Sequence, residues 1–171
     1  MTCAPVITTD RLVLRPHVMA DFEPYAALFA SDRAVHMGML KRRHAWYSFT
    51  SDVAGWALHG HGAWGIIDRE SGVFLGQVAL LKPDHFPEVE LGWFLMQHAE
   101  GKGIALEAAT HALEFARDTL KLSSLVSYIA VENTRSIALA KRLGAEHDPS
   151  AVLPEGDSAK DTFVYRHRRP Q

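Results

Sequence analysis

Residues 90–109 read Glu-Leu-Gly-Trp-Phe-Leu-Met-Gln-His-Ala-Glu-Gly-Lys-Gly-Ile-Ala-Leu-Glu-Ala-Ala, and this stretch decides the fold. Its first half has the apolar pattern of a strand, a Gly-Lys-Gly turn follows at 101–103, and its second half has helical spacing. Glycines let the backbone approach a ligand closely, and the free N–H groups at the start of a helix attract negative oxygens. The stretch is therefore a candidate pyrophosphate site, with Lys102 as an additional positive charge.

Two other phosphate-binding motifs fail here at single residues. A dinucleotide-binding Gly-x-Gly-x-x-Gly requires a third glycine where Leu106 stands. A P-loop requires Ser or Thr after Gly-Lys, but Gly103 follows Lys102 directly. Taken alone, the glycine pair is also compatible with a simple turn, so the rest of the chain must distinguish the two readings.

The remaining sequence predicts an α+β fold in a single domain, 1–171. Alternating and apolar runs predict strands at 10–15, 63–67, 74–81, 89–96, 125–131 and 161–166. Helical spacing and capping residues predict helices over 19–29, 43–58, 104–120 and 136–143. The short connections between the middle strands favour an antiparallel meander, so we expect one mixed, mostly antiparallel sheet flanked by helices.

Composition excludes several classes of protein. The 171 residues are 47% hydrophobic and 22% charged with a formal net charge of -2, which fits one soluble globular domain and argues against a general nucleic-acid-binding surface. The only cysteine, Cys3, excludes an internal disulfide and Cys-rich zinc sites. Without a signal-like or membrane-spanning segment, we expect a cytoplasmic protein that binds neither nucleic acid nor membrane.

Two histidine-containing segments are predicted to carry no function. His59 and His61 lie in a glycine-rich loop without a nearby cluster of carboxylates or cysteines, so we expect solvated loop residues and no metal. The basic tail, His167–Arg169, is too short for a nucleic-acid arm and is expected to be solvated.

Four motifs in order make the chain resemble the GNAT acetyltransferase superfamily, and within it the ribosomal-protein N-terminal alanine acetyltransferases (RimJ/RimL-type). The motifs are residues 9–15 (Thr-Asp-Arg-Leu-Val-Leu-Arg), 90–93 (Glu-Leu-Gly-Trp), 101–108 (Gly-Lys-Gly-Ile-Ala-Leu-Glu-Ala) and 133–144 with its Asn-Thr-Arg-Ser start and Lys-Arg-Leu-Gly end. The resemblance covers nearly the whole chain. It implies acetyl-CoA as co-substrate, bound where two neighbouring strands splay apart.

The resemblance also assigns cofactor-binding positions. Phe94, Leu95 and Met96 should line the pantetheine, and the pyrophosphate should lie on the backbone of Gly101, Lys102, Gly103, Ile104 and Ala105. Asn133 and Ser136 should approach the pantetheine arm, although helix capping explains both residues equally well.

The chain departs from the family pattern at three positions. His98 stands in place of the usual Arg or Gln, Ala140 in place of a tyrosine that serves as general acid in many members, and Ala145 in place of an aromatic residue. The missing tyrosine leaves the general acid open. It is also the reason to consider a non-catalytic CoA-binding sensor, while an ordinary protein-interaction domain is a third reading.

Amine acetylation by direct attack needs a base, an oxyanion donor and a proton for the thiolate. Glu90 is our candidate base and Glu88 the second choice, with the backbone N–H near Leu95 as oxyanion donor. Ser136 or Tyr165 is the candidate acid.

The acceptor is left open by the sequence. A protein N-terminus, a polyamine, an amino acid and an antibiotic all offer a primary amine. It should enter beside the N-terminal helices, where Trp46, Tyr47, Trp56 and Trp64 are possible walls, although helical spacing favours the core for Trp46 and Trp56. A homodimer is an expectation from the family alone.

Overall fold

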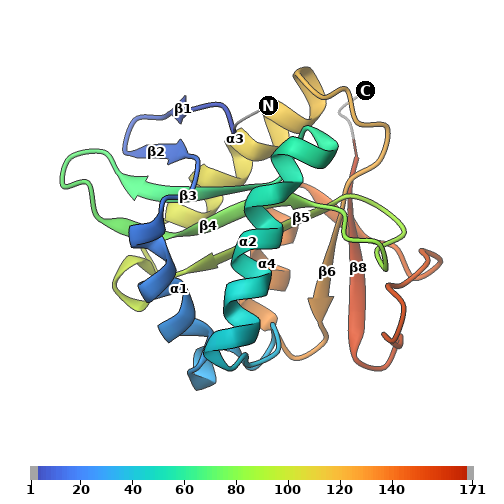
Figure 1. Ribbon diagram of the computed structural model, residues 1–171. Coiled ribbons are helices and arrows are strands. Elements are labelled where there is room, and N and C mark those ends of the chain that lie inside the picture. The colour runs from blue at the N-terminus through green and yellow to red at the C-terminus, as the bar shows by residue number, and fades with distance from the viewer. Residues whose placement is uncertain (1–3, 169–171) are drawn as a thin grey trace.

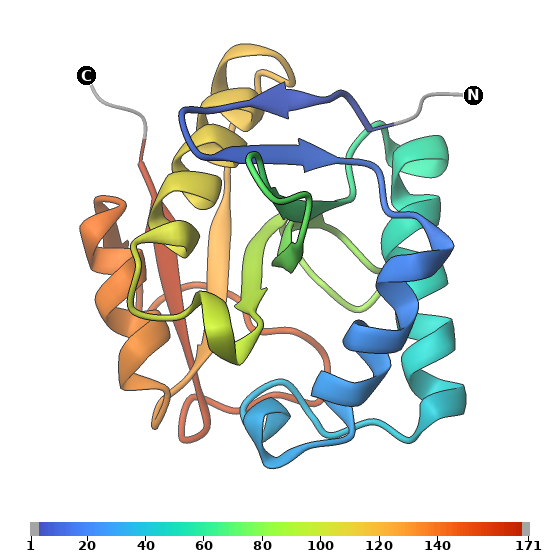
Figure 2. The same ribbon diagram turned by 90° about the vertical axis from the view of Figure 1, so that its left-hand side faces the viewer.

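The computed structural model describes residues 4–168, and Cys3 and Arg169 therefore lie outside the described residues. Eight strands form one sheet in this part of the chain (Figure 1). Helices α1 and α2 cover one face of the sheet, and α3 and α4 cover the other (Figure 2). The α+β architecture expected from the sequence is confirmed.

The elements have the following bounds. The helices are α1 (Phe22–Phe29), α2 (Arg42–His59), α3 (Ile104–Asp118) and α4 (Thr134–Arg142), with short 3-10 turns η1 (Met19–Asp21), η2 (Asp32–Ala34) and η3 (Gln97–Ala99). The strands are β1 (Ile7–Thr8), β2 (Leu12–Arg15), β3 (Ala63–Asp68), β4 (Phe74–Leu81), β5 (Glu90–Leu95), β6 (Val126–Ala130), β7 (Ala145–His147) and β8 (Thr162–His167).

The sheet is mixed and mostly antiparallel, as predicted. Its strand order is β1-β2-β3-β4-β5-β6-β8-β7, and the only parallel neighbours in the described sheet are β5 and β6. The predicted elements all form with shifts of a few residues at their ends. Strands β1 and β7 are not predicted from the sequence, because strands of two and three residues are too short to show a period.

Strand β5 lies unusually close to β4 at one position. Gly76 pairs with Leu95 and has a φ of 148°, a backbone conformation that L side chains rarely adopt. A Cβ at Gly76 would lie 2.2 Å from the Phe94 carbonyl oxygen, so only glycine lets β5 lie this near. This contact brings the backbone of Phe94 and Leu95 close to β4.

The tryptophan predictions are partly wrong. Trp56 is buried as expected and packs edge-on against Trp64 with ring centroids 4.5 Å apart, so neither ring walls an acceptor site. Trp46, predicted as core, is 38% exposed. Trp46 and Phe49 lie on the same side of α2. Phe49 is buried, but the Trp46 ring lies at the edge of the core, against Phe22 of α1.

Two histidine predictions are also wrong. His61 is buried rather than solvated, because its Nδ1 lies 2.8 Å from the Leu80 carbonyl oxygen where the loop packs on β4. His167 is the buried last residue of β8, not part of a solvated tail. In both places, pairing along β4 and β8 brings a polar residue inward.

Candidate active site

Strands β5 and β6 separate almost as soon as they meet. Their register contains the single pair Glu90 and Val126, and Figure 1 shows β6 turning away from the direction of β4 and β5. Beyond Glu90, the β5 backbone therefore lacks a β6 partner in its ladder. Unpaired backbone groups on a strand can bond an extended ligand as an added strand would, which is the arrangement expected for pantetheine.

A side-chain pin holds the two strands at the start of this split. The Ser127 hydroxyl donates to the Leu91 carbonyl oxygen at 2.6 Å and lies 2.9 Å from Nε2 of His167. Since the hydroxyl proton goes to Leu91, the ring nitrogen donates to the Ser127 oxygen. Burial lowers the pKa of His167 to about 4, which keeps this ring neutral. No local pattern of residue types predicts this contact between Ser127 and His167.

The side chains predicted to line pantetheine point to two different faces of β5. Phe94 and Met96 are buried in the cluster under α1 and α2, whereas Leu95 packs against the core under α3. The rings and aliphatic groups thus belong mostly to the core. What these residues could offer to a ligand in the split is their backbone, except the Met96 N–H, which donates to the Leu75 carbonyl oxygen at 2.8 Å.

The Gly-Lys-Gly turn has the shape that an anion site needs. Gly101 and Gly103 both have left-handed φ values, 72° and 76°, and Gly103 is the N-cap residue of α3. With no side chain, Gly103 cannot cap the helix, so the first N–H groups of α3, beginning at Ile104 and Ala105, carry no side-chain cap. Lys102 is exposed beside them.

The first family-like motif clamps this turn from behind. The Arg11 guanidinium donates to the Lys102 carbonyl oxygen at 2.9 Å and to the Glu107 carboxylate at 2.7 Å. Thr9 donates to the same carboxylate at 2.5 Å. Because Arg11 binds the Lys102 carbonyl oxygen, it holds the turn in a conformation that leaves the backbone N–H groups at the start of α3 for a ligand. Sequence reasoning assigned no role to this arginine, because it lies 91 residues from Lys102.

A second ion-pair group ties the segment before the turn to its neighbours. Glu100 accepts two hydrogen bonds from Arg135 of α4, both at 2.9 Å, and is also paired with Arg33 of η2. These pairs connect the turn to α4 and to η2, which follows α1. Their partners, too, are far apart in sequence.

Glu90 stands at the point where the strands split, on the α1 and α2 face of the sheet. Its carboxylate folds over Gly92, whose added Cβ would lie 3.5 Å from a Glu90 oxygen. Burial raises the pKa of Glu90 to about 7; the backbone N–H of Tyr128 opposes this shift, and the charge of Asp52 adds to it. A carboxylate with such a pKa can take a proton near neutral pH.

Glu88, the second candidate base, has a different environment. Arg166 donates to both of its carboxylate oxygens, at 2.7 and 2.9 Å, and Ser124 donates as well. These hydrogen bonds lower the pKa of Glu88, in spite of partial burial. A carboxylate held in this way is a structural ion pair, which favours Glu90 as the base.

Asn133 and Ser136 form a helix cap. The Asn133 side chain accepts the Ser136 backbone N–H at 3.1 Å, and α4 begins at Thr134. Ala140 is buried one turn further on, in a cluster with Tyr165. Trp93 of β5 packs against the same cluster, so Tyr165 lies close to the position of the missing family tyrosine.

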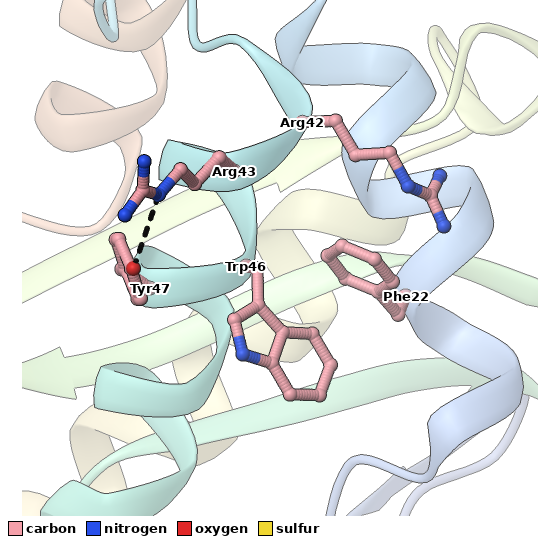
Figure 3. A pocket seen from close by; sticks show the side chains of 5 residues that line it. All are labelled: Phe22, Arg42, Arg43, Trp46 and Tyr47. Atoms are coloured by element: carbon pink, nitrogen blue, oxygen red, sulfur yellow. Dashed lines mark hydrogen bonds between the residues drawn. The ribbon is translucent and has the colours of Figure 1, made fainter.

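An open pocket of about 480 Å³ lies on the outer surface where α2 crosses α1 (Figure 3). The Trp46 ring meets the Phe22 ring edge-on, with centroids 5.0 Å apart. The Arg43 guanidinium donates to the Tyr47 hydroxyl at 3.2 Å. Arg42, paired with Glu23, lies over the other side of Phe22. Of the four predicted walls, Trp46 and Tyr47 are thus the two available to a ligand.

None of the helices in residues 4–168 has the length and apolar character needed to cross a membrane. No group of three or more His, Cys, Asp or Glu side chains in those residues is placed to hold a metal ion.

Comparison with known proteins gives relatives along the whole chain. An acetyltransferase of known structure from Agrobacterium tumefaciens str. C58 is 40% identical and superposes with a TM-score of 0.91, covering 97% of this chain and 95% of that one. A structure from Vibrio cholerae, provisionally identified as a ribosomal-protein-serine acetyltransferase, is 25% identical with a TM-score of 0.76, covering 97% of this chain and 98% of that one.

A curated relative matches over a shorter range. The Uncharacterized N-acetyltransferase YnaD of Bacillus subtilis (strain 168) is 24% identical over 102 residues, which are 58% of this chain and 60% of that protein. The family model described as Acetyltransferase (GNAT) domain matches residues 11–146, from the clamp arginine through the glycine turn to β7. The chain therefore belongs to the GNAT acetyltransferase family, whose co-substrate is acetyl-CoA.

Proposed function

We propose that this protein transfers the acetyl group of acetyl-CoA to a primary amine by direct attack. The observation that carries the proposal is the combination of a split between β5 and β6 with a left-handed glycine turn at the start of α3. The first suits an extended pantetheine arm and the second a pyrophosphate. Glu90 stands at the closed end of that split, where a thioester would meet an amine.

The proposed cofactor contacts are mostly backbone contacts. Phe94 and Leu95 would hydrogen-bond the pantetheine through their main chain, and Met96 would do so through its carbonyl oxygen, because its N–H is bonded to Leu75. Residues 101–105 would bind the pyrophosphate, with Lys102 adding charge. Asn133 is committed to capping α4, so its contribution, like that of Ser136, would come through the position of the helix end. The backbone N–H near Leu95 would face the developing oxyanion.

Glu90 would serve as the base. An acceptor amine arrives largely protonated, so its N–H bond must break and the proton must move to the Glu90 carboxylate before the nitrogen attacks the thioester carbon. The pKa of Glu90, about 7, lies near that of an α-amine, roughly 7.7 to 8.0, which makes this transfer nearly balanced. A lysine amine, with a pKa of about 10.4, would need more help.

Ser136 or Tyr165 would give the proton to the departing thiolate. Ser136 lies at the start of α4, and Tyr165 packs with Ala140, the position at which many family members carry their tyrosine. Single Ser136→Ala and Tyr165→Phe variants separate the two, because only the loss of the true donor lowers kcat while acetyl-CoA binding is retained.

Among acceptors we favour a protein N-terminal α-amine. The motif resemblance to the ribosomal-protein N-terminal acetyltransferases supports this choice, as does the likeness to the Vibrio cholerae protein. The modest pKa of Glu90 is also better matched to an α-amine than to a lysine. Small amines such as a polyamine, an amino acid or an antibiotic are the alternative acceptors, and a homodimer is proposed only from the family resemblance.

The first test is calorimetric titration with acetyl-CoA, desulfo-CoA and ATP, followed by a turnover assay on an amine panel. The panel contains Ala-Ala-Ala-amide, spermidine, free alanine and kanamycin. We expect saturable binding of both CoA compounds but not of ATP, and turnover of the tripeptide. Binding of CoA without any turnover would favour a non-catalytic sensor, and no CoA binding would make residues 101–103 a structural turn.

A further inference from the structure

Asp52 is a buried acidic residue that the proposed reaction does not yet use. It lies on the inner face of α2 and is 8% exposed. No Lys, Arg or His forms an ion pair with it among residues 4–168, whereas the other buried carboxylate of this face, Asp21, is paired with Arg15 at 2.7 Å. Buried carboxylates are normally paired with a cation, so the absence of one at Asp52 calls for an explanation.

Neutral groups hold Asp52 in one orientation. Its Oδ2 accepts from the Gln77 side-chain amide at 2.9 Å and from the Tyr25 hydroxyl at 3.3 Å. The Gln77 carbonyl oxygen in turn lies 2.9 Å from Nε2 of His17, and the hydroxyl oxygens of Tyr25 and Ser48 lie 2.9 Å apart. Both known hydrogen bonds converge on Oδ2, which leaves Oδ1 as the oxygen available to a ligand.

The sheet register places Glu90 and Gln77, the β4 partner of Asp52, on the same face of the sheet. Gln77 pairs with Phe94, Ala79 with Gly92, and Leu81 with Glu90, so these pairs follow one another along one face. The middle pair consists of the two smallest residues. The Glu90 carboxylate leans over Gly92 from one end, and Gln77 holds Asp52 at the other end.

We propose that Asp52 is a second substrate-binding carboxylate, which receives the cationic amine of the acceptor together with Glu90 on the sheet face of Ala79 and Gly92. The inference rests on the proposed acetyl transfer and defines its acceptor as a positively charged primary amine. The ammonium group supplies the cation that both carboxylates lack within the protein. One N–H bond then breaks toward Glu90, forming its O–H bond, while Asp52 keeps a hydrogen bond to the neutral amine nitrogen.

The electrostatic properties of the two carboxylates support this assignment. Burial raises the pKa of Asp52 to about 6, and the charge of Asp52 is one cause of the raised pKa of Glu90. Two neighbouring buried carboxylates without a cationic partner form a strong site for a cation. The other polar groups that face Asp52 are Tyr25 and Ser48 from the helices, Gln77 from β4 and His17 from the segment before η1.

The test compares wild type with Asp52→Asn on the panel amine that gives turnover. We expect the KM for that amine to rise about tenfold or more, which matches the loss of one hydrogen bond to a charged group, and the KM for acetyl-CoA to change less than about twofold. Tyr25→Phe is the matched control, because it removes a hydrogen bond from Oδ2 and keeps the charge. Equal effects of the two variants would show a merely structural role and overturn the proposal.

A second measurement needs no turnover. Methylammonium chloride is titrated into the desulfo-CoA complex while the side-chain carboxyl 13C signals of Asp52 and Glu90 are followed by NMR. We expect saturable shifts of both signals in wild type and none at Glu90 in Asp52→Asn. Acetyl transfer with an unchanged KM in that variant, or no shift in wild type, would overturn the role of Asp52. Absence of turnover together with a saturable shift would instead count against the proposed function alone.

Discussion

At the scale of single residues, the burial and the hydrogen-bond partners of each carboxylate determine its pKa. Glu88 lies just before β5 and Glu90 is its first residue, yet Arg166 lowers the pKa of Glu88 and burial raises that of Glu90 to about 7. Their pKa values differ because Arg166 of β8 forms an ion pair with Glu88. A strand pattern alone cannot distinguish them.

Replacement of Glu90 by Gln should lower kcat by about 100-fold at pH 8, since it removes the general base. In wild type, kcat should rise with pH through about 7 as Glu90 ionises, and the variant should lose this rise. A pH series of initial rates with saturating substrates checks both points. Acetyl-CoA affinity is the control, and an unchanged kcat would remove Glu90 from the chemistry.

The same substitution has a stability consequence with a definite sign. Because the folded-state pKa of Glu90 is raised, its contribution to stability is present below its unfolded pKa and is lost as pH rises through about 7. The free energy of unfolding of the Gln variant, measured relative to that of wild type, should therefore be higher at pH 8.5 than at pH 5.5. Urea unfolding at the two pH values measures this difference.

At the scale of elements, the glycine turn owes its geometry to a loop at the other end of the chain. Arg11, between β1 and β2, holds the Lys102 carbonyl oxygen and the Glu107 carboxylate, and these two residues flank the first turn of α3. The clamp leaves the N–H groups of the turn for a ligand. The family model also begins at residue 11.

Replacement of Arg11 by Ala should weaken acetyl-CoA binding about tenfold with little change in kcat, because the clamp positions the turn and lies away from the reacting atoms. Calorimetric Kd values and steady-state rates separate the two effects. Arg168→Ala is the matched control, since it removes another exposed ion pair, with Glu146 at 3.0 Å. Equal affinities of wild type and Arg11→Ala would contradict the clamp.

At the scale of the whole molecule, strands β5 and β6 diverge, but the eight strands still belong to one sheet. The Ser127 and His167 pin, together with the Glu90 and Val126 pair, joins the β1–β5 part to the β6–β8 part. The pin contains a histidine that is neutral when folded. The cohesion of the molecule should therefore depend on pH.

Replacement of His167 by Gln should flatten the acid side of the stability profile. The pKa of His167 is lowered to about 4 from 6.5, so the unfolded chain takes up this proton first, and wild type should lose stability as pH falls from about 6.5 to about 4. The loss amounts to about 3 kcal/mol at most. Urea unfolding across this range checks it, with the exposed His44→Gln variant as control; parallel profiles for wild type and His167→Gln would exclude the effect.

Local chain properties determined most of the fold. The alternation in β2 and β8, the helical spacing of α3 and the glycines at 101–103 are each readable over a few residues, because local steric and burial preferences set them. The same short segments carried the family resemblance and the backbone part of the cofactor site. Glu90 could be named as a candidate base from its place on β5.

Only the tertiary structure decided which polar residues work together. It placed Arg11 next to the glycine turn, Ser127 and His167 at the split, and Asp52 of α2 beside Gln77 of β4. It also put Trp46 at the surface and His61 inside. These outcomes depend on hydrogen bonds and ion pairs between residues far apart in the chain, and their energies arise from burial in a particular packing, which no local pattern of residue types encodes.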